Sequence, residues 1–178
     1  MKKLSESIWG DIRKKSLGKE EREENEIGNI KYMSPVDVDG DVLWANKDFE
    51  LADGTCFFDY EFAKNFGEVK GWRLPTLEEA DDFLKMGNLR ELCNSDESYF
   101  IHHKTHDEYL WFKKRGFLNH NDYNVRENEY AAWIGGSKYA EAFGFEPSEP
   151  HSYRRAQYRV LVNRSDCKFC IRLVRDRK

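Results

Sequence analysis

The chain has 178 residues, of which 39% are hydrophobic and 35% charged, enough apolar residues for one folded domain and too many charged ones for a membrane protein. No run of about 18 apolar residues occurs, so we expect no transmembrane helix and no membrane partner. Residues 1–25 lack the apolar segment of a secretory signal peptide, which predicts synthesis in the cytoplasm and leaves open release inside a particle such as a virion.

Residues 1–26 differ from the rest of the chain and are predicted to form a helix followed by a charged linker. Ser5 or Ser7 can cap this helix, and Gly18 can end it. Its apolar stripe is too small to hold a helix in water alone, so the segment must dock on its own domain or on a partner. The candidate docking residues are Ile8, Trp9, Ile12 and Leu17. We interpret this segment as a tether to another protein of a larger assembly, and residues 27–178 as the folded domain.

A hairpin turn is predicted at Asp39-Gly40, which lies between apolar residues. Asp37, Asp39 and Asp41 also imitate the start of a calcium loop. The glycine and the glutamate that complete such a loop do not follow, so we favour the plain turn. Further along, residues 59–67 are predicted to form a short helix that begins at a capping aspartate and ends at a glycine.

Residues Gly71–Thr76 are predicted to begin a helix that runs to about Gly87. The Thr76 hydroxyl can accept from the first-turn backbone, and Glu79 completes a capping box. Apolar residues recur at helical spacing at Leu77, Ala80, Phe83 and Leu84. Trp72 precedes the cap and can pack under the first turn. This pattern favours a structural helix start over a catalytic role.

Beyond this helix the signals become strand-like from Tyr99 onward, after a possible second helical turn at Asn88–Cys93. The predicted strands are Glu108–Phe112, Tyr130–Ile134, Tyr158–Val162 and Phe169–Arg175. We expect the last two to pair as an antiparallel hairpin that turns at Asn163–Asp166. Residues 119–124 are polar and turn-rich, and residues 137–153 show little strand or helix pattern.

The cysteines and histidines do not predict a metal site. Cys167 and Cys170 have the spacing of a zinc knuckle, but Cys56 and Cys93 supply no second pair, so we expect free thiols. Residues 102–106 contain three histidines at spacings that suit a metal pair on a helix. No zincin-type glutamate lies between them, and a solvated loop is favoured. We therefore predict no metal and no cofactor.

The net charge of −4 is unevenly distributed along the chain. Between residues 150 and 178, nine Lys or Arg face only Asp166 and Asp176, which gives a net charge of +7. Such a segment can bind phosphate groups of nucleic acid. We favour the alternative in which these arginines form the solvent-exposed face of a terminal strand.

Taken in order, these segments resemble the motifs of the Fibrobacter succinogenes major paralogous domain and the related domain of unknown function DUF1566. The matching segments are Val36–Ala45, Ala63–Thr76 with Glu78-Glu79, Leu110–Gly116, Ala131–Trp133 and Cys170–Asp176. The resemblance covers about residues 33–178. It implies an α+β, C-type-lectin-like fold with small twisted antiparallel sheets, about two helices and long loops.

Two features of the sequence qualify this resemblance. Trp133–Gly136 stands where the family has a Tyr-Trp-Ser-Ser strand, and the family's usual secretion or lipoprotein signal is missing, which argues against a cell-surface lipoprotein. Leu4–Arg13 and the charged run after it resemble leader segments on proteins of bacteriophages that infect gut Bacteroidetes.

We predict a non-enzymatic binding or structural module, a component of a larger assembly such as a bacteriophage particle. Its loops would contact a receptor, a glycan or a protein. The sugar-binding triplets of calcium-dependent lectins are missing. The resemblance also implies a relation to the formylglycine-generating enzymes of the sulfatase-modifying-factor fold, but we find no motif of those enzymes. The alternatives are a cytoplasmic enzyme of the sulfatase-modifying-factor type and a nucleic-acid-binding domain that uses the basic C-terminal strands.

The ligand surface is predicted on two loops, Asn119–Asn128 and Gly135–Tyr153, because loops can vary without unfolding the domain. The candidate ligand-binding residues are Asn121, Asp122, Tyr123, Asn124, Tyr139, Phe143, Phe145, His151 and Tyr153. Aromatic and amide side chains together suit sugar rings or a protein surface. The alternative is that these aromatic side chains fold inward as a satellite core under a long loop.

Overall fold

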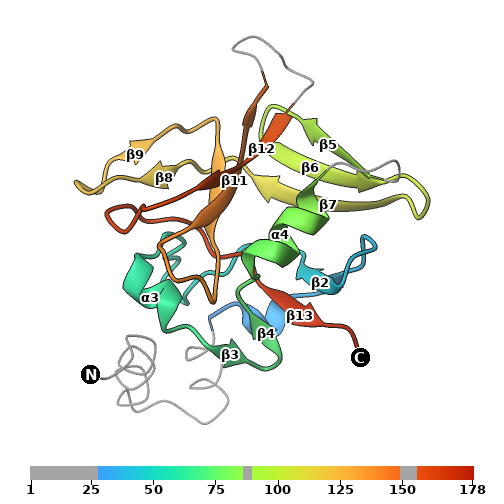
Figure 1. Ribbon diagram of the computed structural model, residues 1–178, viewed down its shortest axis with the longest axis horizontal. Helices are drawn as coiled ribbons and strands as arrows, with labels where there is room; N and C mark the ends of the chain where they lie inside the picture. The colour runs from blue at the N-terminus through green and yellow to red at the C-terminus, as the bar shows by residue number, and fades with distance from the viewer. Residues whose placement is uncertain (1–27, 86–89, 149–155) are drawn as a thin grey trace.

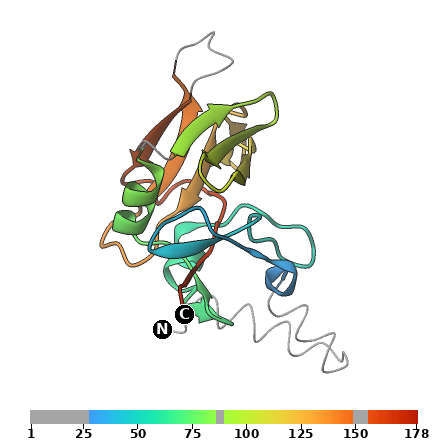
Figure 2. The ribbon, with the colours of Figure 1, turned by 90° about the vertical axis from the view of Figure 1, so that its right-hand side faces the viewer.

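The structure is a computed structural model that describes residues 28–85, 90–148 and 156–178. In these ranges the chain forms small antiparallel sheets and two short α-helices, an α+β architecture (Figure 1). Figure 2 shows two three-stranded sheets side by side above a five-stranded sheet. The predicted tether, with Ile8, Trp9, Ile12 and Leu17, lies outside the described residues.

The five-stranded sheet brings the last strand of the chain between early ones. Its order is β1 (Pro35–Val36), β2 (Val42–Ala45), β13 (Val174–Asp176), β4 (Trp72–Arg73) and β3 (Glu68–Val69). Val174 of β13 lies opposite Trp44 on one side and Arg73 on the other, and both pairings are antiparallel. The predicted turn at Asp39-Gly40 does connect β1 to β2, and Asp39 has the positive φ of 63° that such turns use.

The helices begin as the sequence predicts. A 3₁₀ turn, η1 (Ile30–Tyr32), precedes the short helix α3 (Tyr60–Lys64), whose cap Asp59 accepts from Phe62 N at 2.8 Å. Helix α4 (Leu77–Leu84) has the predicted capping box. The Thr76 hydroxyl accepts from Glu79 N at 3.1 Å, and the Glu79 carboxylate accepts from Thr76 N at 2.9 Å. Helix α4 ends at Leu84, a few residues before the predicted end.

The second sheet contains a strand that the sequence reasoning missed. Its order is β10 (Tyr130–Trp133), β11 (Ala142–Pro147) and β12 (Ala156–Leu161), so β11 is central although residues 137–153 were expected to be irregular. Glycine and proline in β11 hide the pattern because both are uncommon in strands. Gly144 is required there, since a Cβ atom would lie 2.3 Å from the Tyr130 carbonyl oxygen.

The predicted hairpin between the last two strands is wrong. Strand β12 pairs with β11, and β13 belongs to the five-stranded sheet. Between them the chain crosses the molecule, and Phe169 and Cys170 form isolated bridges with Phe58 and Ala132. A short turn between two apolar segments suggests a hairpin, but here each segment is buried against a different, distant strand.

The third sheet consists of β5 (Arg90–Asn94), β6 (Ser98–His103) and β7 (Glu108–Lys113), and a separate hairpin follows as β8 (Phe117–Leu118) and β9 (Asn124–Val125). The second helical turn expected at Asn88–Cys93 is wrong for its described part, which is strand β5. Leu92 of β5 lies opposite Ile101 of β6, and both side chains are buried. This apolar cross-strand contact explains why the segment is extended.

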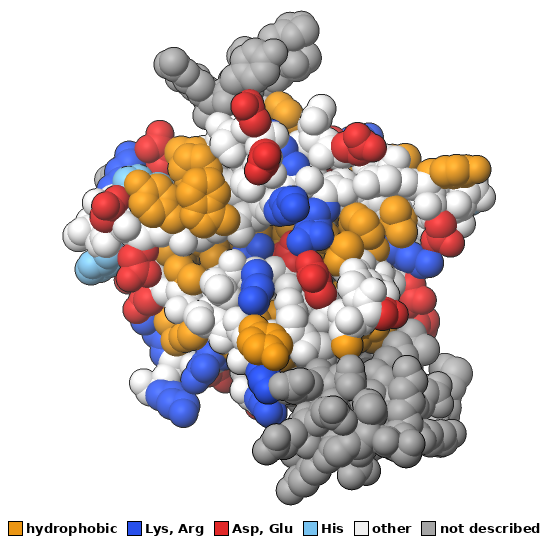
Figure 3. Space-filling view, turned by 180° about the vertical axis from the view of Figure 1, so that it is seen from behind, with side chains coloured by type: hydrophobic (Ala, Val, Ile, Leu, Met, Phe, Trp, Pro, Cys, Tyr) orange, Lys and Arg blue, Asp and Glu red, His pale blue; other side chains and the backbone are white. Residues whose placement is uncertain are grey.

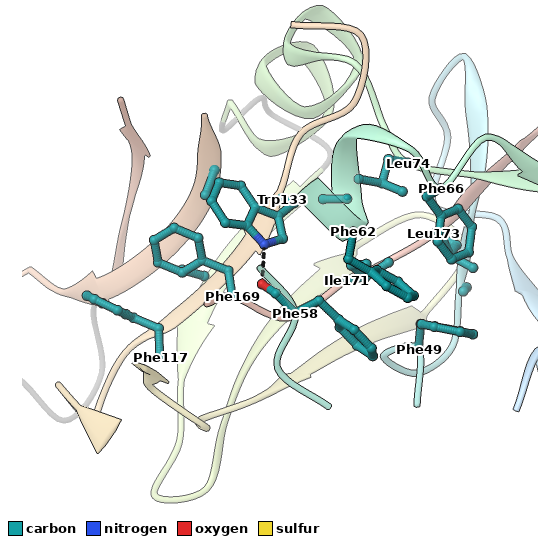
Figure 4. Close-up of a cluster of buried hydrophobic side chains, with 14 of the residues drawn as sticks. Phe49, Phe58, Phe62, Phe66, Leu74, Phe117, Trp133, Phe169, Ile171 and Leu173 are labelled. Carbon is teal, nitrogen blue, oxygen red and sulfur yellow. Dashed lines mark hydrogen bonds between the residues drawn. The ribbon is translucent and has the colours of Figure 1, made fainter. Parts of the chain in front are cut away.

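Two buried clusters hold the sheets together. In the first, the Trp133 indole N–H donates to the Phe58 carbonyl at 2.7 Å, among the apolar side chains drawn in Figure 4. In the second, Trp44 stacks on Phe83 of helix α4 at 5.0 Å and meets Phe143 at 5.7 Å. Trp72 of the predicted helix-start motif is buried in the first cluster. The motif therefore serves the core.

Candidate binding surface

The first predicted loop, Asn119–Asn128, comprises the turn between β8 and β9, strand β9 itself and the turn that follows it. The Asn119 side-chain oxygen accepts from the backbone N–H groups of Asn121 at 2.9 Å and Tyr123 at 3.1 Å. The Asn124 side chain donates to the Arg115 carbonyl at 3.1 Å. Of the side chains proposed for ligand binding, that of Asn124 thus helps to shape this turn together with Asn119, an alternative use that asparagine often has.

Two of the predicted ligand-binding aromatic residues are exposed. Tyr123 is 69% exposed in the β8–β9 turn, and Tyr139 is 54% exposed between β10 and β11. Asp122, next to Tyr123, is exposed but forms an ion pair with Lys168 at 2.8 Å. These residues meet the exposure that the predicted loop surface requires, although they come from different turns.

The assignment of Phe143 and Phe145 to a ligand surface is wrong. Both belong to β11, the central strand of its sheet, and neither side chain is exposed. The Phe143 ring contacts Trp44 in the core, because the strand is covered on both faces. The predicted sites His151 and Tyr153 lie outside the described residues.

An exposed row of aromatic side chains lies instead on the outer face of the β5–β6–β7 sheet. We call it the aromatic face, and it consists of Phe100 and His102 on β6 and Tyr109 and Trp111 on β7. Trp111 is 47% exposed and Tyr109 is 40% exposed. Seen from behind, the molecule shows a hydrophobic patch over this sheet, with histidine beside it (Figure 3). A contiguous exposed apolar patch is typical of a binding site.

The rings of the aromatic face form two cross-strand pairs. His102 lies opposite Tyr109, and their rings are 4.4 Å apart and 5° from parallel. Phe100 lies opposite Trp111, and their rings are 4.5 Å apart at 34°. The Asp107 carboxylate lies 2.8 Å from His102 Nε2 and fixes that ring. Such pairs stabilise a sheet and hold the exposed rings in place.

The sequence contains a pattern that indicates this face. Along β6 and β7, buried residues alternate with exposed or half-buried ones. The buried set is Tyr99, Ile101, His103, Leu110 and Phe112. This period of two was visible in the sequence. Both alternating sets contain aromatic residues, however, so hydrophobicity alone does not show which set faces solvent.

A buried ion pair fixes the backbone of β7 behind Trp111. Arg172 Nε donates to Asp48 Oδ1 at 2.8 Å, and Tyr130 donates its hydroxyl to the same oxygen at 2.6 Å. Arg172 Nη2 donates to the Trp111 carbonyl at 2.8 Å. Burial is the largest single effect and opposes the charge of Arg172, but the Asp48 carboxylate, Tyr130 and Cys170 together outweigh it and raise the pKa of the guanidinium. Arg172 is therefore an internal anchor and not, as expected for the C-terminal arginines, part of a solvent-exposed strand face.

The histidine-rich segment is the expected exposed loop only at Lys104–His106, whereas His102 and His103 belong to strand β6. Strand β6 continues to His103, whose ring is buried because the alternation turns it inward. Its Nδ1 accepts from His106 N at 3.2 Å, and its Nε2 lies 3.6 Å from Asp39 Oδ2. Across residues 28–85, 90–148 and 156–178, no three His, Cys, Asp or Glu side chains are grouped so that they could hold a metal.

The four cysteines are free thiols, two of them buried (Cys167 and Cys170) and two partly exposed (Cys56 and Cys93). Burial raises the pKa of all four thiols, most strongly that of Cys170. A thiol with a raised pKa stays protonated at neutral pH and is a weak nucleophile.

Several of the described basic residues of the C-terminal segment are engaged within the protein. Arg159 forms ion pairs with Glu129 and, at 2.9 Å, with Glu146. Arg177 forms an ion pair with Asp37, and this contact lowers the pKa of that carboxyl to about 2. These internal pairs reduce the charge available to a nucleic-acid backbone.

A hollow of about 320 Å³ lies beside the helix-start motif. Its lining consists of Ala63, Lys64, Gly67, Arg73, Leu74, Thr76, Gly135 and Gly136. Arg73 is held by Glu79 at 2.6 Å and by Asp176 at 2.7 Å, and Thr76 is engaged in the helix cap. The polar groups of the hollow therefore serve the fold, and we place the candidate site on the aromatic face.

In the part of the chain that the structure describes, neither helix length nor apolar character reaches what a bilayer crossing needs. Comparison of the chain with protein-family models, with curated proteins and with solved structures gave no match in any of the three. The family resemblance thus rests on the sequence motifs alone.

Proposed function

We propose that this chain is a non-enzymatic binding module with a C-type-lectin-like fold, and that its aromatic face is the contact surface. The observation that carries the proposal is the exposure of Trp111 and Tyr109 on a rigid sheet. Exposed, well-held aromatic rings give a large contact area at low entropic cost, which makes them frequent binding hot spots.

Two further observations support binding rather than catalysis. The described thiols have raised pKa values, which weakens them as nucleophiles. Beside the hollow, Arg73 forms ion pairs with Glu79 and Asp176, so these charged groups stabilise the fold. The proposal replaces the predicted loop surface with the sheet surface as the main site, and keeps Tyr123 and Tyr139 as exposed residues for comparison.

We further propose that the module belongs to a larger assembly, such as a bacteriophage particle, to which residues 1–26 tether it. The support is the amphipathic, charged character of that segment in the sequence. Deleting residues 1–26 should leave the circular dichroism spectrum and binding at the aromatic face unchanged, and should abolish incorporation into the assembly. Aggregation of the shortened chain would contradict the tether.

The binding role is tested by measuring retention of the purified chain on a panel of bacterial cell-envelope preparations. Trp111→Ala should abolish retention, and Tyr139→Ala, which removes an equally exposed ring elsewhere, should preserve it. Urea unfolding of both variants checks that each is folded. Retention that persists in Trp111→Ala but is lost in Tyr139→Ala would place the site on the predicted loops. If no preparation retains the unmodified protein, the binding role is contradicted.

A further inference from the structure

We propose that the aromatic face binds an uncharged oligosaccharide, with consecutive sugar rings lying against Tyr109 and Trp111. This inference rests on the proposed function, because it names the ligand class of the same surface. Three features carry it, namely the orientation of the rings, the open edge of the sheet and the pairing of the charged side chains around the face.

The first feature is the way the rings are turned. His102 and Tyr109 lie on neighbouring strands and stack face to face at 4.4 Å, so the plane of the Tyr109 ring faces across the strands. Trp111 is two residues further along the same strand, and its ring is 21° from parallel to that of Tyr109. Residues two apart are displaced along the strand. The two rings are therefore nearly parallel and offset along the strand, with centroids 6.0 Å apart, and both turn a face across the strands.

The second feature is the open side of this surface. Strand β7 is the last strand of its sheet, so His102 and Phe100 back the Tyr109 and Trp111 rings only on the side of β6. The opposite faces of the two rings have no strand of this sheet against them, in agreement with their exposure of 40% and 47%, although strand β1 of the five-stranded sheet approaches β7. An open strip suits an extended chain of rings better than a compact small molecule, which needs a concave pocket.

The third feature is charge. The Asp107 carboxylate lies 2.8 Å from His102 Nε2, and Lys104 lies 3.9 Å from Glu91 on the neighbouring strand. The charged groups at the Tyr109 end of this face thus lie beside polar or oppositely charged partners, which favours an uncharged ligand there. Lys113, two residues beyond Trp111, adds an exposed positive charge at the other end.

Sugar rings match all three features. Each ring has an apolar C–H face that packs on a flat aromatic surface, and its hydroxyl groups project from the rim. Asp107, exposed at one end of the strip, and the Tyr109 hydroxyl, which hydrogen-bonds to it, offer hydrogen-bonding groups to such sugar hydroxyls. The spacing of the Tyr109 and Trp111 rings is comparable with the length of one sugar residue.

The test is native gel electrophoresis of the full chain through gels that contain xylan, galactomannan, a mixed-linkage β-glucan or α-glucan. We expect at least one of these neutral polysaccharides to retard the protein. Replacing a stacking ring should weaken the interaction about tenfold in Trp111→Ala, and Trp111→Phe should restore most of it. Tyr139→Ala is the matched control and should migrate like the unmodified protein. Added salt should not change the retardation, because screening acts on charges.

Three results would overturn the assignment: no retardation by any neutral polysaccharide, equal retardation of Trp111→Ala and the unmodified protein, or loss of retardation in salt. If all four polysaccharides fail while a cell-envelope preparation still retains the chain through Trp111, the ligand class is wrong and the binding role stands. If Trp111→Ala changes neither interaction, both proposals fail.

Discussion

The two faces of the β5–β6–β7 sheet contain similar aromatic residues in opposite surroundings. Phe112 is fully buried, with its ring 5.1 Å from Tyr130 and 5.0 Å from Phe145. Trp111, the residue before it, is 47% exposed. Adjacent residues of a strand point to opposite faces, so one strand serves both surroundings. The core explains the aromatic content of the inner face, whereas the outer-face rings contact one another across the strands and remain partly exposed.

The largest expected effect is a loss of stability, and it distinguishes two neighbouring residues of β7. Phe112→Ala should lower the free energy of unfolding by about 3–5 kcal/mol, because it leaves a cavity in the core. Trp111→Ala should cost only about 1 kcal/mol, as expected for a half-exposed site. Urea unfolding of both variants measures the difference. Equal losses would show that the outer face also supports the fold and would remove the distinction between the two faces.

A comparable loss is expected at the buried ion pair that links the core to the outer face. Asp48→Ala leaves the Arg172 guanidinium buried without its carboxylate, which should cost about 3–5 kcal/mol. Adding Arg172→Met removes the unpaired charge and should recover part of that loss. Thermal unfolding of the single and double variants measures this recovery. A double variant less stable than Asp48→Ala would mean that the Arg172 bonds to Ala45 and Trp111 matter more than its charge.

A smaller effect concerns how the stability of the inner face depends on pH. Burial raises the pKa of Tyr99, an inner-face residue that donates its hydroxyl to the Asn128 carbonyl. The folded state therefore holds this proton more tightly than the unfolded chain, whose tyrosines ionise at about pH 10. The resulting stabilisation is complete below that pH and is lost as the pH rises towards the folded-state pKa.

Tyr99→Phe should consequently flatten the alkaline decline in stability, at the cost of about 1 kcal/mol near neutral pH for the lost hydrogen bond. Urea unfolding at about pH 8 and about pH 11 gives both quantities. An equally steep decline in Tyr99→Phe would assign the alkaline loss to other buried tyrosines, such as Tyr130, whose pKa is also raised by burial.

The smallest effect tests whether the helix-start motif is separate from the binding surface. Thr76→Ala removes the cap of α4 and should cost about 1 kcal/mol. Thr76→Ser keeps the hydroxyl and should cost less. Neither variant should change polysaccharide retention, measured in the same gels. A loss of retention without unfolding would connect the motif to the ligand.

Local signals in the sequence predicted the local structure well. Asp59 and Thr76 cap their helices as expected, since a cap depends on residues within one turn. Strand β11 and the placement of β13 could not be predicted, because both depend on contacts with distant strands. Gly144, for example, reads as a strand breaker until the Tyr130 carbonyl is seen against it.

The candidate site could be predicted only in part. The exposure expected of Tyr123 and Tyr139 is present, whereas that of Phe143 and Phe145 is not. Phe143 and Phe145 lie on a strand whose buried face they share, whereas Tyr123 and Tyr139 lie in turns that meet solvent. The exposure of Trp111 could not be predicted either, because the sequence of an alternating strand does not reveal which of its two sets of aromatic residues is buried.

The exposure of Trp111 is the most direct test of the whole account, and acrylamide quenching of tryptophan fluorescence measures it. Trp44, Trp72 and Trp133 are buried, so in a Trp9→Phe background we expect one accessible tryptophan, whose quenching disappears in Trp111→Phe. A retained polysaccharide should protect the same signal. If no tryptophan is accessible in the free protein, another part of the chain covers the aromatic face, and the proposed binding surface is contradicted.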